Sequence, residues 1–111
     1  MDLFAGIRVS DLARAKDWYS RLLGAEPSFA PNDTEHVWTL DDHRHVYVQL
    51  DRERAGDALI TLFVEDLEQR VAAAAERGIE PANRETYSNG VRKVTYRDAD
   101  GNEIGFGGPP A

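Results

Sequence analysis

Three histidines lie within ten positions of this chain, at His36, His43 and His45. Histidine is a common metal ligand, but a divalent ion needs several nitrogen, oxygen or sulfur donors at compatible spacing. The chain has no cysteine, and no carboxylate completes a ligand set around these histidines. We therefore expect solvated histidines around an exposed turn at residues 41–44, although His36 or His45 can still reach a binding groove as a hydrogen-bond partner.

The other chemistry-bearing residues also argue against a catalytic centre. The absence of cysteine removes disulfides, thiolate zinc sites and cysteine nucleophiles. The run Gly105-Phe106-Gly107-Gly108 follows a predicted strand but opens no helix, so it does not have the context of a phosphate-binding loop. The carboxylates of Asp98 and Asp100 lie beside Gly101 and Asn102, and turn formation alone explains this cluster.

An internal repeat sets the elements that position these residues. The run Ile7-Arg8-Val9-Ser10-Asp11-Leu12 returns as Leu62-Phe63-Val64-Glu65-Asp66-Leu67. Each copy leads into a helical pattern, which ends at Gly24 or Gly78, and each predicted helix begins at a capping residue: Ser10 or Asp11, then Asp66. Because a repeat determines architecture, we predict one domain over residues 1–111. It consists of module one at about 1–52, a linker at about 51–57 and module two at about 58–108.

Strict alternation in the predicted strands places neighbouring residues on opposite sheet faces. Residues 28–34 are predicted as a strand end and a loop, and residues 81–90 as a polar loop. A strand–helix–strands unit that occurs twice, with its helices on one sheet face, is an α+β arrangement with a concave surface on the other face. That surface is predicted to carry Phe4, Gly6, Arg8, His45, Tyr47, Gln49, Leu59, Thr61 and Phe63.

Composition limits the partners of the protein. A formal net charge of −7 over 111 residues repels nucleic acid and anionic lipid, and no local cluster of Lys and Arg reverses it. No apolar run is long enough to span a bilayer, and the first residues lack the regions of a signal peptide. The lack of cysteine fits a reducing compartment. We expect a cytoplasmic protein with no nucleic-acid partner and no membrane association.

Two motifs resemble the vicinal oxygen chelate superfamily, which includes glyoxalase I, extradiol dioxygenases, and fosfomycin and bleomycin resistance proteins. Val9-Ser10-Asp11-Leu12, with Trp18-Tyr19 and Leu23-Gly24, resembles its first strand and helix. Residues 97–104 resemble its closing Asp-Pro-Asp-Gly-Asn hairpin, with Ala99 in the proline place. The resemblance covers about residues 3–107. It implies two βαβββ modules that form a curved mixed sheet with helices on the outer face and a concave groove, and commonly a homodimer.

The resemblance also implies where a metal would bind. Enzymes of this superfamily hold one divalent ion through His, Glu or Gln side chains on the first and last strands of each module. The matching positions here are Phe4, Leu59, Gly105 and, in the loosest alignment, Gln49. Three of these four residues have no donor atom, and one Gln cannot replace several ligands. We therefore expect no metal, no cofactor and no catalytic residue.

The predicted function is metal-independent binding of a small organic molecule, aromatic or apolar, in a carrier, sequestering or resistance role. In this the chain resembles bleomycin-resistance proteins, which bind a drug without transforming it, in clefts between subunits. Apolar walls with a few polar groups suit such a ligand. The predicted ligand-binding residues are Phe4, Arg8, Trp38, Tyr47, Gln49, Leu59, Phe63 and Tyr96.

Two alternatives remain at this point. One is a metal-dependent glyoxalase-like lyase or isomerase, or a dioxygenase, with displaced ligands. The other is a dimerisation or regulatory module without a ligand. The sequence also leaves open which sheet face Trp38 and Tyr96 occupy, and whether the modules pair within one chain or between two chains. It leaves open, too, a metal-free reaction in which Arg8 or a tyrosine is the only acid–base group.

Overall fold

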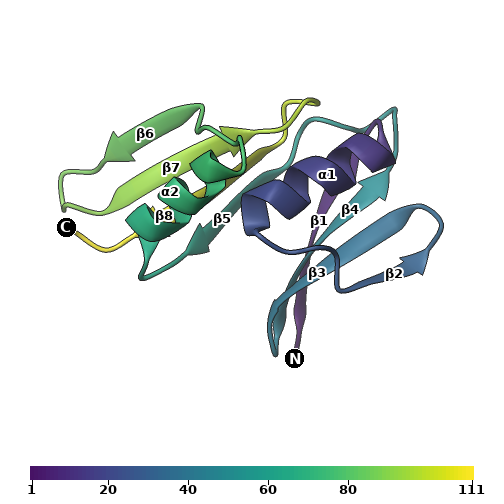
Figure 1. Ribbon diagram of the computed structural model, residues 1–111, viewed down its shortest axis with the longest axis horizontal. Helices are drawn as coiled ribbons and strands as arrows, with labels where there is room; N and C mark the ends of the chain where they lie inside the picture. The colour runs from purple at the N-terminus through teal and green to yellow at the C-terminus, as the bar shows by residue number, and fades with distance from the viewer.

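The computed structural model describes residues 1–111 and consists of two modules with the same element order (Figure 1). Module one contains β1 (Leu3–Val9), α1 (Leu12–Leu23), β2 (Phe29–Asn32), β3 (Glu35–Asp41) and β4 (Arg44–Leu50). Module two contains β5 (Leu59–Phe63), α2 (Leu67–Glu76), β6 (Asn83–Thr86), β7 (Arg92–Arg97) and β8 (Glu103–Gly108). The predicted α+β fold with a repeated βαβββ module is confirmed.

Each module forms its own four-stranded sheet, with strand orders β1-β4-β3-β2 and β5-β8-β7-β6. The first and last strands of each module run parallel, and the other neighbours are antiparallel. No hydrogen-bonded ladder joins β1 to β5, so the structure has two mixed sheets where we predicted one curved sheet. Both helices lie on the same side of the strands, which leaves the opposite faces uncovered by helix (Figure 1).

The helix boundaries follow local capping chemistry. The Asp11 carboxylate accepts a hydrogen bond from the Arg14 amide at the start of α1, and Gly24 ends that helix with φ 78°, in the left-handed region that glycine tolerates. Asp66 occupies the predicted N-cap position of α2, but its side chain makes no capping bond and instead accepts from the Arg70 guanidinium. Neither helix is long and apolar enough to cross a bilayer.

Strand β6 and much of β2 lie in segments that we predicted as loop. All residues of both strands are exposed. Each is the outermost strand of its sheet and is hydrogen-bonded on one side only. A strand exposed on both faces has no apolar alternation, so a reading based on period alone misses it.

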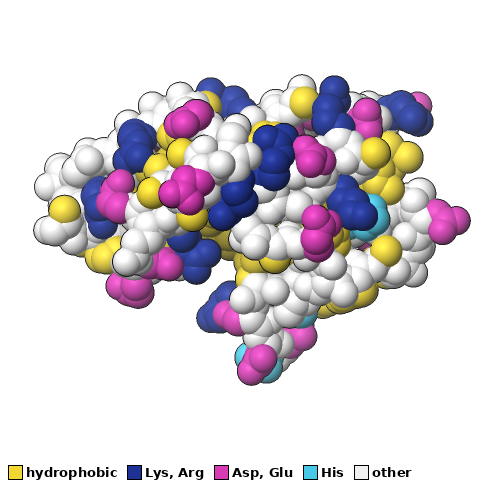
Figure 2. Space-filling model, viewed as in Figure 1, with side chains coloured by type: hydrophobic (Ala, Val, Ile, Leu, Met, Phe, Trp, Pro, Cys, Tyr) yellow, Lys and Arg dark blue, Asp and Glu magenta, His cyan; other side chains and the backbone are white.

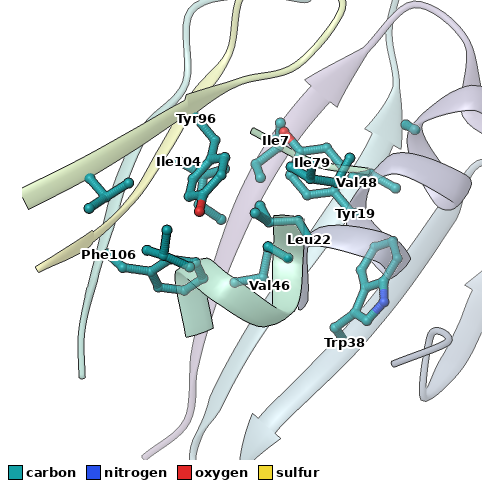
Figure 3. Close-up of a cluster of buried hydrophobic side chains, with 14 of the residues drawn as sticks. Ile7, Tyr19, Leu22, Trp38, Val46, Val48, Ile79, Tyr96, Ile104 and Phe106 are labelled. Carbon is teal, nitrogen blue, oxygen red and sulfur yellow. The ribbon is translucent and has the colours of Figure 1, made fainter. Parts of the chain in front are cut away.

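A single hydrophobic core lies beneath the helices and joins both modules (Figure 3). Aromatic and aliphatic side chains of module two pack there against the helix-side faces of β1 and β4 and against α1. Its buried members include Ile7, Tyr19, Leu22, Trp38, Val46, Val48, Ile79, Tyr96, Ile104 and Phe106.

The turn between β7 and β8 fastens module two to module one. The amide of Asn102 donates to the Arg8 carbonyl at 2.8 Å, and its oxygen accepts from the backbone N–H groups of Gly56 and Ala58. Because the Asn102 side chain is buried, every one of these bonds forms away from water. We predicted this residue only as a turn former, and the structure adds an inter-module contact.

The two aspartates of the same turn extend this fastening to α1. The Tyr19 hydroxyl donates to Asp98 at 2.7 Å, and the Ser10 amide donates to Asp100 at 2.9 Å. At the other end of the helices, Arg77 donates to the carbonyls of Arg21 and Leu22, which lack partners within α1. A cation at a helix C-terminus also interacts favourably with the helix dipole. These contacts hold the two sheets in one relative orientation.

Candidate ligand-binding groove

The sheet face of module one that points away from the helices carries three rows of side chains. The parallel register of β1 and β4 pairs Phe4 with His45, Gly6 with Tyr47, and Arg8 with Gln49. Four predicted ligand-binding residues therefore share this face, as alternation indicated: Phe4, Arg8, Tyr47 and Gln49.

The corresponding face of module two is more apolar. Leu59 is 70% exposed and Phe63 is 61% exposed, and both project from β5 on this face with Thr61 between them. Their partners on β8 include Gly105 and Gly107, which add no side chain. Two large apolar side chains thus stand in solvent over a floor of glycines.

The strands β1 and β5 flank the boundary between the two modules and run in opposite directions (Figure 1). At one end, Arg8 of β1 and Ala58, which precedes β5, line the same cavity of about 300 Å³. At the other end, Leu3 of β1 and Phe63 of β5 line a cleft of about 760 Å³. Figure 2 shows this cleft as a notch between the modules, with hydrophobic atoms at its inner end. We call the open faces of β1, β4 and β5, together with the smaller cavity, the groove.

The smaller cavity is the polar end of the groove. Gly6, Arg8, Tyr47 and Gln49 line it from module one, and Arg54, Asp57 and Ala58 line it from the following linker. Phe4 and Leu59 line neither cavity, but lie on the adjacent open faces. The structure thus brings three of the predicted residues into one cavity and places Phe63 at the apolar end. Arg54 and Asp57 were not among the predicted residues, because no pattern in a charged linker shows which side chains turn inward.

Trp38 and Tyr96 do not belong to the open faces. The register pairs Trp38 with Val46 and Tyr96 with Ile104, and both partners are core residues. Trp38 is 2% exposed, its indole N–H donates to the Ala25 carbonyl at 2.9 Å, and it reaches only the inner wall of the cleft. Tyr96 is fully buried against Phe106. Both residues are removed from the candidate site, because large aromatic rings fill the space between helix and sheet.

His45 is buried, which corrects the expectation that all three histidines are solvated. Its ring stacks on Phe4 with centroids 4.1 Å apart, and it is hydrogen-bonded to Thr39 and Asp2. The exposed His43 binds the other oxygen of Asp2 at 3.0 Å. These hydrogen bonds, first from His43 and then from His45, hold the pKa of the Asp2 carboxyl below its ordinary value. The two histidines therefore fasten the residue before β1 to β4.

The residues at the superfamily's metal positions do not fit a divalent ion. The Phe4 ring is stacked on His45, and Leu59 has no donor atom. Gly105 has no side chain, and a Cβ there would lie 3.0 Å from the Val94 carbonyl oxygen. Only Gln49 offers an oxygen. No group of three or more His, Cys, Asp or Glu side chains that can hold a metal occurs elsewhere. His36 and His45 do not come together, because His36 lies on the opposite face of β3 from Thr39, the residue that pairs with His45.

Two contacts made by groove residues were not predicted from the sequence. The Tyr47 ring lies across Gly6, where an added Cβ would be 2.7 Å from the phenol carbon and oxygen. Glycine inside a strand often marks such a close approach, so Gly6 in the sequence already indicated that another group packs on β1 here. Arg8 forms an ion pair with Asp51 at 3.5 Å. Glu103 at the start of β8 accepts a hydrogen bond from Arg97 and is therefore not the partner of Arg8.

Comparison with known proteins places this architecture in a family. Residues 2–106 match the Glyoxalase/Bleomycin resistance protein/Dioxygenase superfamily. The chain belongs to this superfamily. A glyoxalase/bleomycin resistance protein from Catenulispora acidiphila DSM 44928, known from its crystal structure, is 54% identical, superposes with a TM-score of 0.96, and matches over 99% of both chains.

Among more distant structures of the same fold, one is named as a binding protein and another as an enzyme. A bleomycin-binding protein in complex with bleomycin is 15% identical, with a TM-score of 0.80 over 98% of both chains. Lactoylglutathione lyase from Agrobacterium tumefaciens is 16% identical, with a TM-score of 0.75 over 97% of this chain and 92% of that one. No curated protein matches the chain significantly. Because the superfamily's fold serves both a binder and a lyase, function has to be argued from the site.

Proposed function

We propose that this chain is a metal-independent member of the superfamily that binds a small organic molecule in the groove, in a carrier, sequestering or resistance role. One observation carries the proposal: apolar, exposed side chains stand where metal ligands would be expected. Phe4 is 49% exposed and Leu59 is 70% exposed, and neither is needed for the core. Large apolar side chains gathered on an open face mark an interaction site.

The physical basis of binding is burial of this apolar surface. A large apolar side chain that passes from water into contact with a ligand contributes about 1.5–3 kcal/mol. Rings such as Phe4 and Phe63 favour planar partners, because offset and edge contacts add to the area that is buried. The polar side chains Arg8, Tyr47 and Gln49 at one end of the groove would orient the molecule. The bleomycin-binding neighbour supports a ligand of this class, since its name reports a bound organic drug.

Substitutions on the open faces test the proposal. Phe4→Glu and Leu59→Glu are expected to raise the Kd for the neutral aromatic probe N-phenyl-1-naphthylamine by tenfold or more, because each places a carboxylate where an apolar surface was. Both positions are exposed, so the free energy of unfolding is expected to change by less than about 0.5 kcal/mol for lost contacts alone. Probe fluorescence and urea denaturation measure the two effects.

Tyr87→Glu is the matched control, because Tyr87 is an exposed aromatic in the turn between β6 and β7 and does not belong to β1, β4 or β5, whose open faces form the groove. Its variant is expected to bind the probe as the natural chain does. Equal binding by all three variants, or loss of binding only together with loss of the fold, would contradict the proposal.

Metal content tests the metal-independent part separately. Elemental mass spectrometry of untagged protein, purified without chelator, is expected to show no stoichiometric divalent ion. One ion per groove would overturn metal independence and make catalysis the working assumption. The proposal also includes a homodimer, which would cover part of the exposed surface of β5.

A further inference from the structure

The polar end of the groove holds several donor groups that the protein itself does not use. Arg8, Tyr47, Gln49 and Arg54 line the same cavity of about 300 Å³. None of these four side chains forms a hydrogen bond within the chain, although Arg8 and Arg54 approach Asp51 at 3.5 and 4.0 Å. By contrast, most other arginine side chains donate hydrogen bonds within the chain. These are Arg14, Arg21, Arg44, Arg70, Arg77, Arg84, Arg92 and Arg97.

The orientation of Arg8 leaves its best donor edge free. The closest approach of its guanidinium group to Asp51 is 3.5 Å, at Nε, and neither terminal nitrogen donates a hydrogen bond within the chain. These nitrogens form a planar fork that matches the two oxygens of a carboxylate or sulfonate. The side chain of Gln49 projects from the adjacent strand directly opposite Arg8 in the register, and its amide can donate to the same group.

An aromatic surface begins one row away from these donors. The tip of the Tyr47 ring lies directly over Gly6, which has no side chain to displace it. Phe4 and His45 form the next row. Strand geometry separates successive rows by about 7 Å, which is the length of a small fused ring system. The groove therefore passes from paired guanidinium groups to stacked aromatic rings over a short distance.

The charges of the cavity restrict the ligand to a single negative group. Asp57 lines the cavity beside Arg54, and Asp51 lies next to both arginines. Two carboxylates thus balance two guanidinium groups, and the whole chain carries a formal charge of −7. A polyanion would be repelled, whereas one oxyanion can use the free donors of Arg8 at short range.

We infer that the ligand of the groove is an aromatic monoanion. Its carboxylate or sulfonate binds Arg8, with Gln49, Arg54 and the Tyr47 hydroxyl as further donors, and its rings lie along Tyr47 and Phe4. This inference rests on the proposed function and adds the ligand class to it.

A matched pair of probes isolates the anionic group. 1-Anilinonaphthalene-8-sulfonate and N-phenyl-1-naphthylamine share the same aromatic body and differ in one sulfonate. The Kd of each is measured by fluorescence titration for the natural chain and for Arg8→Leu. The ratio of the sulfonate Kd to the neutral-probe Kd is expected to rise at least tenfold in Arg8→Leu. Tyr47→Phe is expected to raise the same ratio by about threefold, since it removes one neutral donor.

Arg52→Leu is the charge-matched control, because Arg52 is an exposed linker arginine that lines no part of the groove. It is expected to leave both dissociation constants unchanged, and circular dichroism checks that each variant is folded. An unchanged ratio of the two dissociation constants in Arg8→Leu, or an equal rise of this ratio in Arg52→Leu, would overturn the inference. If the neutral probe still binds the natural chain, the proposed function stands in either case. Failure of both probes to bind the natural chain would count against the proposed function itself.

Discussion

Two buried tyrosines in the core differ in the fate of their hydroxyl groups. Tyr19 donates to Asp98 at 2.7 Å, whereas the Tyr96 hydroxyl has no hydrogen-bond partner. Burial raises the pKa of both phenols, and the Asp98 charge adds to this for Tyr19. Both side chains are completely buried, so their hydroxyl groups are compared in similar surroundings.

This contrast predicts opposite effects of the same substitution. Tyr19→Phe is expected to lower the free energy of unfolding by about 1–3 kcal/mol, because it removes a buried bond to a carboxylate. Tyr96→Phe is expected to leave stability unchanged or to increase it, because it removes a buried group without a partner. Urea denaturation of both variants measures the difference, and a larger loss for Tyr96→Phe would contradict the assignment.

His36 makes stability depend on pH. Burial, followed by the charge of Lys16, lowers the pKa of His36 below 6.5 in the folded state. Below pH 6.5 the unfolded chain therefore binds more protons at this residue, and its contribution to stability falls as the pH falls. His36→Gln is expected to flatten the fall of unfolding free energy between about pH 7 and pH 5. Identical pH profiles for the two proteins would show that this residue does not titrate as described.

At the scale of elements, the turn between β7 and β8 explains why two small sheets keep one arrangement. Asn102 serves a backbone carbonyl of β1 and two backbone amides of the linker at once. Asn102→Ala would leave these buried groups without partners, and each such loss costs about 1–3 kcal/mol. We expect a destabilisation of roughly 3 kcal/mol in urea denaturation.

Asn89→Ala provides the control for that prediction, since the Asn89 side chain accepts one exposed hydrogen bond within its own turn. It is expected to change stability by less than about 0.5–1 kcal/mol. Similar losses for the two variants would mean that Asn102 acts only through its turn and not between modules.

At the scale of the whole molecule, the open face of module two predicts self-association. Leu59 is 70% exposed and Phe63 is 61% exposed on β5, and contact between two copies at Phe63 would remove part of this apolar surface from water. We expect sedimentation equilibrium to give twice the mass of the 12.4 kDa chain. Phe63→Lys is expected to weaken the dimer by tenfold or more, while Tyr87→Lys leaves it intact. A monomer at micromolar concentration would contradict this expectation.

Much of the groove was predictable because alternation needs only local information. The positions of Phe4, Arg8, Tyr47 and Gln49 on one face follow from the two-residue period of a strand once the helix-facing residues are known. Trp38 and Tyr96 were not assignable in this way, because an aromatic ring fits either a core or a groove. Edge strand β6 was missed for a related reason: both of its faces are in solvent, so its sequence has no period.

The sequence by itself determined the repeat, the fold class and the missing donor atoms at the metal positions, because each depends on residue identity and short-range spacing. Only the tertiary structure decided which distant residues meet. Arg54 and Asp57 reach the cavity of Arg8, and Asn102 binds the end of β1, through packing of two modules whose relative placement no local pattern specifies. Long-range contacts of this kind arise from shared burial and hydrogen bonding across the chain, and so they become visible only in the folded molecule.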